Sequence, residues 1–236
     1  TLINATTGGT SMGNAALDQT AVVVVDDKGN AAIKLTFHSL TFLGQNGYLG
    51  EFRRVTDSGV EKATVVEEYV GIYDSFNDPD SQYKDSNVVG KWYPKVVSIP
   101  VEPSVKDVNV QVYVSVMESI NSGSGTQPAI LRIDWDNIEE KEAVLTGSQI
   151  SVSGDITVNN YIELDDAILN DAGAKVVTTV NGFTSETAVS SAVNTANGYQ
   201  FPVNVPAKDM TADVEISVVN GQGETVDTYT VSVEDY

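Results

Sequence analysis

Short runs of β-branched and aromatic residues, separated by glycine, asparagine, aspartate and proline, recur along almost the whole chain. This pattern is typical of β-strands joined by tight turns, and helical periodicity is nearly absent. In Val108–Val116 valines alternate strictly with more polar residues, which predicts a half-buried strand with one apolar face. Further strands of the first half are predicted at residues 20–25, 31–40, 48–55, 65–72, 95–101 and 129–135.

The second half repeats the pattern after a charged run, Asp136–Glu142, that lacks strand character. We therefore expect two domains, residues 1–143 and residues 144–236, with the boundary near Ala143. The pair Asn181-Gly182 favours a tight hairpin, and Pro206–Thr211 is expected to form a short helical turn. Strands are predicted at residues 149–152, 155–164, 175–180, 183–189, 199–205, 214–220 and 225–233. The predicted fold class is all-β, as two tandem antiparallel β-sandwich domains of the immunoglobulin-like kind.

The composition limits which binding partners and which cellular location are expected. The formal net charge of −20 repels phosphate backbones and anionic headgroups, so nucleic acid is not an expected partner, and no apolar run is long enough for membrane insertion. The absence of cysteine excludes disulfides, thiolate zinc sites and cysteine nucleophiles, and it suits surface proteins of anaerobic or Gram-positive bacteria. We expect an extracellular fragment, at the cell surface or anchored to the cell wall, whose signal peptide and anchor lie outside these residues.

Catalysis is not expected from this sequence. The single histidine, His38, has no nucleophile-elbow motif beside it, and we interpret it as a strand residue with local hydrogen bonds. The 33 acidic residues guarantee accidental carboxylate pairs, so such pairs do not identify a glycosidase. A carbohydrate-binding module, with Trp92, Tyr93 or Trp135 as a platform on which sugars stack, is a third class of function.

Two segments carry side chains that suit metal chemistry. The loop Asp74–Asp80 concentrates hard oxygen ligands; solvated loop residues are the favoured interpretation, and a structural calcium site is the alternative. Met12 and Met117 both stand next to flexible segments, and thioether sulfur can serve as an axial ligand of haem iron. From spacing alone, ordinary core filling is the favoured interpretation of both. The candidate calcium ligands are Asp74, Asn77, Asp78 and Asp80.

Residues 1–136 resemble the NEAT (near-transporter) domains by which Gram-positive bacteria capture haem or haemoproteins at the cell surface. The resemblance rests on Ser11-Met12, where such domains place a short lip helix, on Leu35–Val55 as a central hairpin, and on Val110–Met117 paired with Ile130–Trp135. Haem-binding members carry a Tyr-x-x-x-Tyr motif on the last hairpin. This chain has Met117 and a glycine-rich stretch there, so ligation by tyrosine is not carried over.

The same resemblance implies a different pair of iron ligands. A related group of streptococcal surface haem proteins ligates haem with two methionines, and Met12 and Met117 look similarly placed. Haem is then expected between the lip helix and the last hairpin, with these methionines as axial ligands. The further pocket contacts that the resemblance implies are Ser11, Tyr48, Tyr113 and Ile120.

The second half resembles immunoglobulin-like modules of surface proteins from gut Firmicutes, most distinctively over Phe201–Met210. No activity attaches to that resemblance, which implies a spacer or an adhesive face. The leading hypothesis is a non-enzymatic cell-surface protein that captures or relays haem, or docks a haemoprotein. The alternative is a structural or adhesive surface protein, of the S-layer or cell-wall adhesin type, that keeps the sandwich without haem. Other cell-surface proteins are further candidate partners.

Overall fold

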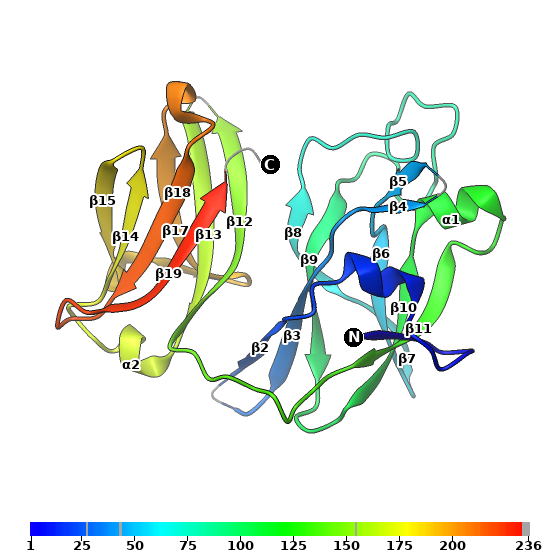
Figure 1. Ribbon diagram of the computed structural model, residues 1–236, viewed down its shortest axis with the longest axis horizontal. Helices are drawn as coiled ribbons and strands as arrows, with labels where there is room; N and C mark the ends of the chain where they lie inside the picture. The colour runs from blue at the N-terminus through cyan, green and yellow to red at the C-terminus, as the bar shows by residue number, and fades with distance from the viewer. Residues whose placement is uncertain (27, 43, 154, 233–236) are drawn as a thin grey trace. The chain divides into compact units, whose positions relative to one another are not determined.

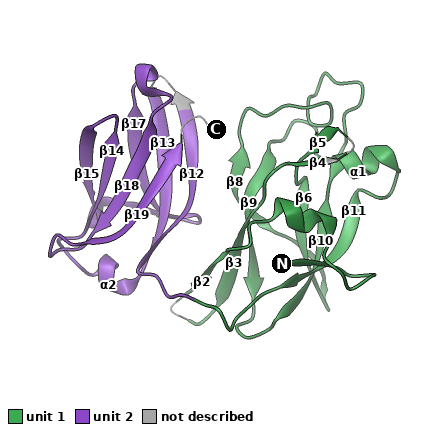
Figure 2. Ribbon diagram, in the orientation of Figure 1, with its two compact units in different colours: residues 1–138 green, residues 139–236 purple. Residues whose placement is uncertain are grey.

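The computed structural model describes the chain apart from residues 27, 43, 154 and 233–236 (Figure 1). The chain divides into two compact units, residues 1–138 and residues 139–236, both built of antiparallel sheets (Figure 2). The predicted all-β fold of two sandwiches is confirmed. The division falls after Ile138, whereas the sequence placed it near Ala143, where the first strand of the second unit begins. No helix in the described part of the chain combines the length and apolar character needed to cross a bilayer.

The described residues of unit 1 form eleven strands and two short helices. The strands are β1 (Leu2–Asn4), β2 (Val22–Val25), β3 (Ala31–Thr36), β4 (Leu40–Phe42), β5 (Gln45–Gly47), β6 (Glu51–Thr56), β7 (Gly59–Lys62), β8 (Thr64–Tyr69), β9 (Tyr93–Val101), β10 (Asp107–Tyr113) and β11 (Thr126–Arg132). One sheet has the order β1-β11-β10-β6-β7, the other has the order β2-β3-β9-β8, and β4 pairs with β5 as a separate hairpin. The helices are the 3₁₀ helix η1 (Met12–Ala16) and α1 (Ser115–Ile120).

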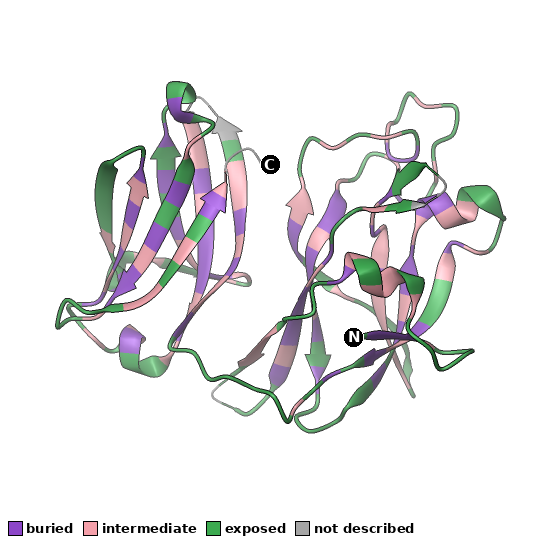
Figure 3. Cartoon of the chain, viewed as in Figure 1, coloured by how far each residue is buried: buried purple, intermediate pink, exposed green. Residues whose placement is uncertain are grey.

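Alternation along the strands fills the core of unit 1. In β10 the side chains of Val108, Val110 and Val112 are buried, while Asp107 before them and Asn109 between the first two are exposed. The buried valines join residues of both sheets in one hydrophobic cluster, and Figure 3 shows the buried segments along the strands. Since full burial of a valine or leucine side chain stabilises the fold by about 1.5–3 kcal/mol, this cluster is the main support of the sandwich.

Unit 2 is a sandwich of two four-stranded sheets around its own core. Its strands are β12 (Ala143–Ser153), β13 (Asp155–Leu164), β14 (Lys175–Val180), β15 (Phe183–Ala188), β16 (Val193–Thr195), β17 (Gly198–Val205), β18 (Asp213–Val219) and β19 (Thr225–Ser232), with the short helices α2 (Asp166–Leu169), η2 (Val189–Ser191) and η3 (Ala207–Asp209). The sheet orders are β12-β13-β17-β16 and β15-β14-β18-β19. The helical turn predicted after Pro206 is confirmed as η3. Val233, the last residue of the predicted final strand, lies outside the described residues.

One strand prediction is wrong at its end, and it concerns a candidate haem ligand. β10 stops at Tyr113 and Ser115–Ile120 form α1, so Met117 lies on a helix instead of ending a strand. Val116, 2% exposed, continues the apolar series although the strand has ended, which is why the alternation misled. The helix is closed against the following loop by Glu118, whose carboxylate accepts hydrogen bonds from backbone N–H groups at 2.9 and 2.8 Å. The sequence also gave no sign of β1, β7 or β16. Within the central hairpin expected over Leu35–Val55, only the shorter β4–β5 hairpin forms, because β3 and β6 belong to different sheets.

Candidate functional site

Residues 70–92, here called the 70–92 loop, connect β8 to β9 and are fixed by the amide of Asn77. This side chain is 0% exposed. Its Nδ2 donates to the carbonyl oxygens of Ile72, at 2.9 Å, and Lys91, at 3.0 Å, and its Oδ1 accepts from the N–H of Asp74 at 2.8 Å. Because Ile72 and Lys91 stand near opposite ends of the loop, one buried amide ties its two ends together.

Asp74 adds a second anchor inside the same loop. Its carboxylate accepts hydrogen bonds from the N–H groups of Phe76, at 2.7 Å, and Asn77, at 3.2 Å. The hydroxyl of Tyr93 donates to both carboxylate oxygens, at 2.9 and 3.0 Å. Burial and this hydrogen bond raise the pKa of Tyr93 well above its ordinary value, so the phenol stays a donor. The loop is therefore preorganised by its own side chains.

These contacts give two of the four candidate calcium ligands another role. Asp74 and Asn77 hold the loop, and one oxygen of Asp78 accepts from the N–H of Asp80 at 2.8 Å. In the described ranges, no three acidic or histidine side chains gather as a metal-binding group. Calcium prefers six to eight oxygen ligands, which this arrangement of carboxylates does not by itself supply. The calcium site stays a prediction.

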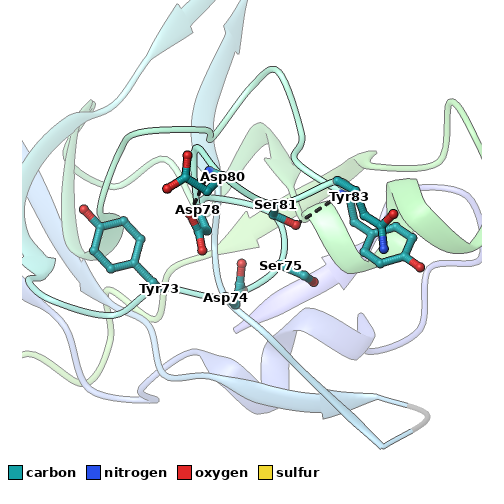
Figure 4. A pocket seen from close by; sticks show the side chains of 8 residues that line it. Tyr73, Asp74, Ser75, Asp78, Asp80, Ser81 and Tyr83 are labelled. Atoms are coloured by element: carbon teal, nitrogen blue, oxygen red, sulfur yellow. Dashed lines mark hydrogen bonds between the residues drawn. The ribbon is translucent and has the colours of Figure 1, made fainter.

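A cavity of about 390 Å³ lies on the 70–92 loop (Figure 4). It is lined by Tyr73, Asp74, Ser75, Asp78, Asp80, Ser81, Gln82 and Tyr83. In Figure 4 the rings of Tyr73 and Tyr83 stand at opposite ends of a row of polar side chains. Both tyrosines are solvent-exposed, at 57% and 67%. The ring of Tyr73 packs edge-on against Trp92, with 4.6 Å between the ring centroids. The cavity thus combines polar oxygens with two aromatic walls.

Tyr113, a predicted haem-pocket contact, belongs to the interior. It is 4% exposed, its hydroxyl donates to the carboxylate of Asp85, and that hydroxyl accepts from Nδ2 of Asn87 at 2.8 Å. Burial, followed by the hydrogen bond to Asp85, raises the pKa of Tyr113 to about 12. Tyr113 is therefore a buried hydrogen-bond donor that joins β10 to the 70–92 loop. Tyr48 packs against the same cluster and stacks on Tyr93, with 5.0 Å between the centroids.

The other four predicted haem-site residues lie at two short helices of unit 1. Ser11 caps η1, its hydroxyl accepting from the N–H of Gly13 at 3.3 Å, and Met12 at the start of that helix is 58% exposed. On α1, Met117 is half-buried and Ile120 is 52% exposed. η1 contacts β4 and α1 contacts β5, so both helices touch one hairpin (Figure 1). Within the described residues neither methionine is part of a buried hydrophobic cluster.

Comparison with known proteins adds little to this geometry. No family model matches the chain. The crystal structure of a DUF3823 family protein from Bacteroides ovatus aligns with 83% of this chain and 96% of that one, at 10% sequence identity and a TM-score of 0.27. Similarity at this level carries no argument about fold or function, so both rest on the residues described above.

The aromatic platform predicted from sequence is corrected by the structure. Tyr93 is 1% exposed and cannot stack on a sugar. Trp135 packs against the core of unit 1 and donates its indole N–H to a backbone carbonyl at 2.8 Å. Trp92 is half-buried and supports the ring of Tyr73. Sequence reasoning missed Tyr73 and Tyr83; their only signal was an aromatic residue on either side of a polar segment.

His38 lies on the surface, just after β3. Its side chain is 55% exposed, and its Nε2 is 2.8 Å from a carboxylate oxygen of Asp18. The hydrogen bond agrees with the interpretation of His38 as a partly exposed, hydrogen-bonded residue, but His38 is not a strand residue as predicted, because β3 ends at Thr36.

Proposed function

We propose that unit 1 is a non-enzymatic binding module that takes up haem, or docks a haemoprotein, on the surface formed by η1, the β4–β5 hairpin and α1. The supporting observation is that Met12 and Ile120, both more than half exposed, sit on two helices that contact one hairpin. Exposed apolar side chains favour an apolar ligand where they form one patch, and the proposal requires Met12 and Ile120 to do so. Haem, when bound, supplies such a face together with an iron that takes axial ligands.

The residues present limit how this chain would hold the iron. The hydroxyl of Tyr113 donates to Asp85 in the interior, so Tyr113 is not proposed as an iron ligand. The thioethers of Met12 and Met117 remain as candidate ligands, and neutral sulfur ligands favour the ferrous state. The cap formed by Ser11 fixes the start of η1 and so restricts the backbone of Met12.

A second candidate function is a structural or adhesive role without haem. It is favoured by the position of the cavity of about 390 Å³, which lies on the 70–92 loop and not between η1 and α1. The acidic, cysteine-free composition supports an extracellular setting for either function. Unit 2 then serves as a spacer or as a face for other cell-surface proteins.

Titration of the haem-free chain with haemin, before and after reduction by dithionite, tests the proposal. We expect a shifted Soret band on reduction that is lost in both Met12→Ala and Met117→Ala. Met210→Ala is the matched control, because Met210 is 47% exposed but belongs to unit 2. A wild-type spectrum identical to that of free haem would support the haem-free role instead. A shifted wild-type spectrum that both unit 1 variants keep would refute ligation by Met12 and Met117.

A further inference from the structure

The 70–92 loop carries a cavity that the haem proposal does not use. It lies on a segment fixed by the buried Asn77 and by the bond from Tyr93 to Asp74. Its volume of about 390 Å³ falls in the range of small-molecule pockets, roughly 300–1,000 Å³. Because the side chains that hold this loop are buried and hydrogen-bonded, the loop is already ordered before a ligand binds. Binding would therefore cost little free energy for ordering the loop.

Two exposed aromatic rings bound this cavity. Tyr73 and Tyr83 are 57% and 67% exposed, although a tyrosine ring is largely apolar. The ring of Tyr73 packs edge-on against Trp92. Exposed flat rings such as those of Tyr73 and Tyr83 suit a ligand that has an apolar face and a polar rim. Pyranose sugars have both, with C–H groups on the ring faces and hydroxyls around the edge.

The floor between the rings offers hydrogen-bond acceptors. Asp78 uses one oxygen for the N–H of Asp80. The ammonium of Lys84 donates to the carbonyl oxygen of Pro79, between the two aspartates, at 2.9 Å. The hydroxyl of Ser81 accepts from the N–H of Tyr83 at 3.1 Å, which leaves its proton free to donate. Ionised carboxylates only accept hydrogen bonds, so the partner must bring donors such as hydroxyls.

The negative charge of the cavity indicates which sugars it can bind. The cavity holds three aspartates and its lining contains no basic residue, in a chain of net charge −20. Phosphate, sulfate and uronic acid groups would be repelled from such a surface. We propose that the 70–92 loop is a binding site for a neutral oligosaccharide, stacked on Tyr73 and Tyr83 and hydrogen-bonded by Asp78, Asp80 and Ser81. The site shares no residue with the surface proposed for haem.

Isothermal titration of the haem-free full chain tests this site, with tetrasaccharides of β-linked glucose, xylose, mannose and N-acetylglucosamine as separate probes. We expect at least one of them to bind. Its affinity should fall about fivefold to tenfold in Tyr73→Ala and in Tyr83→Ala, from the loss of one stacking contact. Asp78→Asn, which keeps the side-chain shape but removes the charge, should also weaken binding. Phe183→Ala is the matched control, because Phe183 is 71% exposed and lies in unit 2.

Three results would overturn the site. The first is no heat of binding with any of the four probes, and the second is equal affinity in wild type, Tyr73→Ala and Tyr83→Ala. The third is calcium binding that depends on Asp78 without any binding of sugar, which would make the loop a metal site. Far-ultraviolet circular dichroism of each variant separates lost binding from lost folding. Met12→Ala should bind sugar as wild type does, so failure of the haem proposal leaves this test intact.

Discussion

Replacing Asn77 with alanine tests whether one amide holds the 70–92 loop. The change removes three hydrogen bonds, to the carbonyl oxygens of Ile72 and Lys91 and from the N–H of Asp74. A hydrogen bond contributes about 1 kcal/mol net, so the free energy of unfolding of unit 1 should fall by about 3 kcal/mol. Ile72 and Lys91 are not fully buried, so water can reach their carbonyl groups and the loss should not exceed this by much.

Tryptophan fluorescence during urea unfolding measures this loss in unit 1 alone. The chain has two tryptophans, Trp92 and Trp135, and both belong to unit 1. With an m value of about 2 kcal/mol per molar urea, a loss of about 3 kcal/mol moves the midpoint by about 1.5 M. Asn109→Ala is the control, since Asn109 is exposed on β10. A loss below about 1 kcal/mol for Asn77→Ala would refute the view that this amide fixes the loop to the sandwich.

Two further predictions use the same fluorescence measurement. Gly125→Ala places a Cβ atom 2.6 Å from the ring of Tyr113, so the free energy of unfolding of unit 1 should fall by about 1–3 kcal/mol. Gly9→Ala is the control and should change this free energy little, because the nearest atom to its Cβ would be 3.7 Å away. Equal stability of the two variants would contradict the clash. Burial alone would raise the pKa of Asp85, but hydrogen bonds led by that from Tyr113 outweigh burial and hold this pKa below its ordinary value. A carboxyl group whose pKa is lower in the folded state stabilises the fold at pH values above its unfolded-state pKa of about 3.9. This contribution is lost as the pH falls through the folded-state pKa. Unfolding of wild type and Asp85→Asn at about pH 6 and about pH 3 should therefore show a smaller acid-induced loss in the variant, and parallel losses would count against the role of Asp85.

The strands that bury one face were predictable from sequence, because burial imposes a period of two on their residues. β10 shows this, and so does the hairpin at Asn181-Gly182, where both residues have positive φ, at 47° and 81°, as its tight turn requires. α1 was not predictable in the same way. Its first residues continue the apolar series of β10. The helix is held to the following loop by the carboxylate of Glu118, which accepts a hydrogen bond from a backbone N–H group beyond the end of the helix.

The candidate sites were predictable only in part, because the sequence gives residue types but not their partners. The oxygen-rich run at Asp74–Asp80 was recognisable from residue types alone. Sequence could not tell that Asp74 and Asn77 face inward and hold the loop, since that depends on Tyr93, which β9 supplies from a distance along the chain. For the same reason Tyr93 was taken for a surface platform, while Tyr73, which is exposed, was overlooked.

The two proposed sites lie on different elements of unit 1, yet they share one small core. Phe76, Val88 and Tyr93 from the 70–92 loop and the start of β9 pack in a cluster with Tyr113 and with Val116 of α1. The bond from Tyr113 to Asp85 joins the loop to the strand that leads directly into that helix. Substitutions on the outer surface, such as Tyr73→Ala, leave this cluster intact and should affect one site only. Substitutions within the cluster move the supports of both surfaces, so a loss of both activities in such variants is evidence of a shared core and not of a shared ligand.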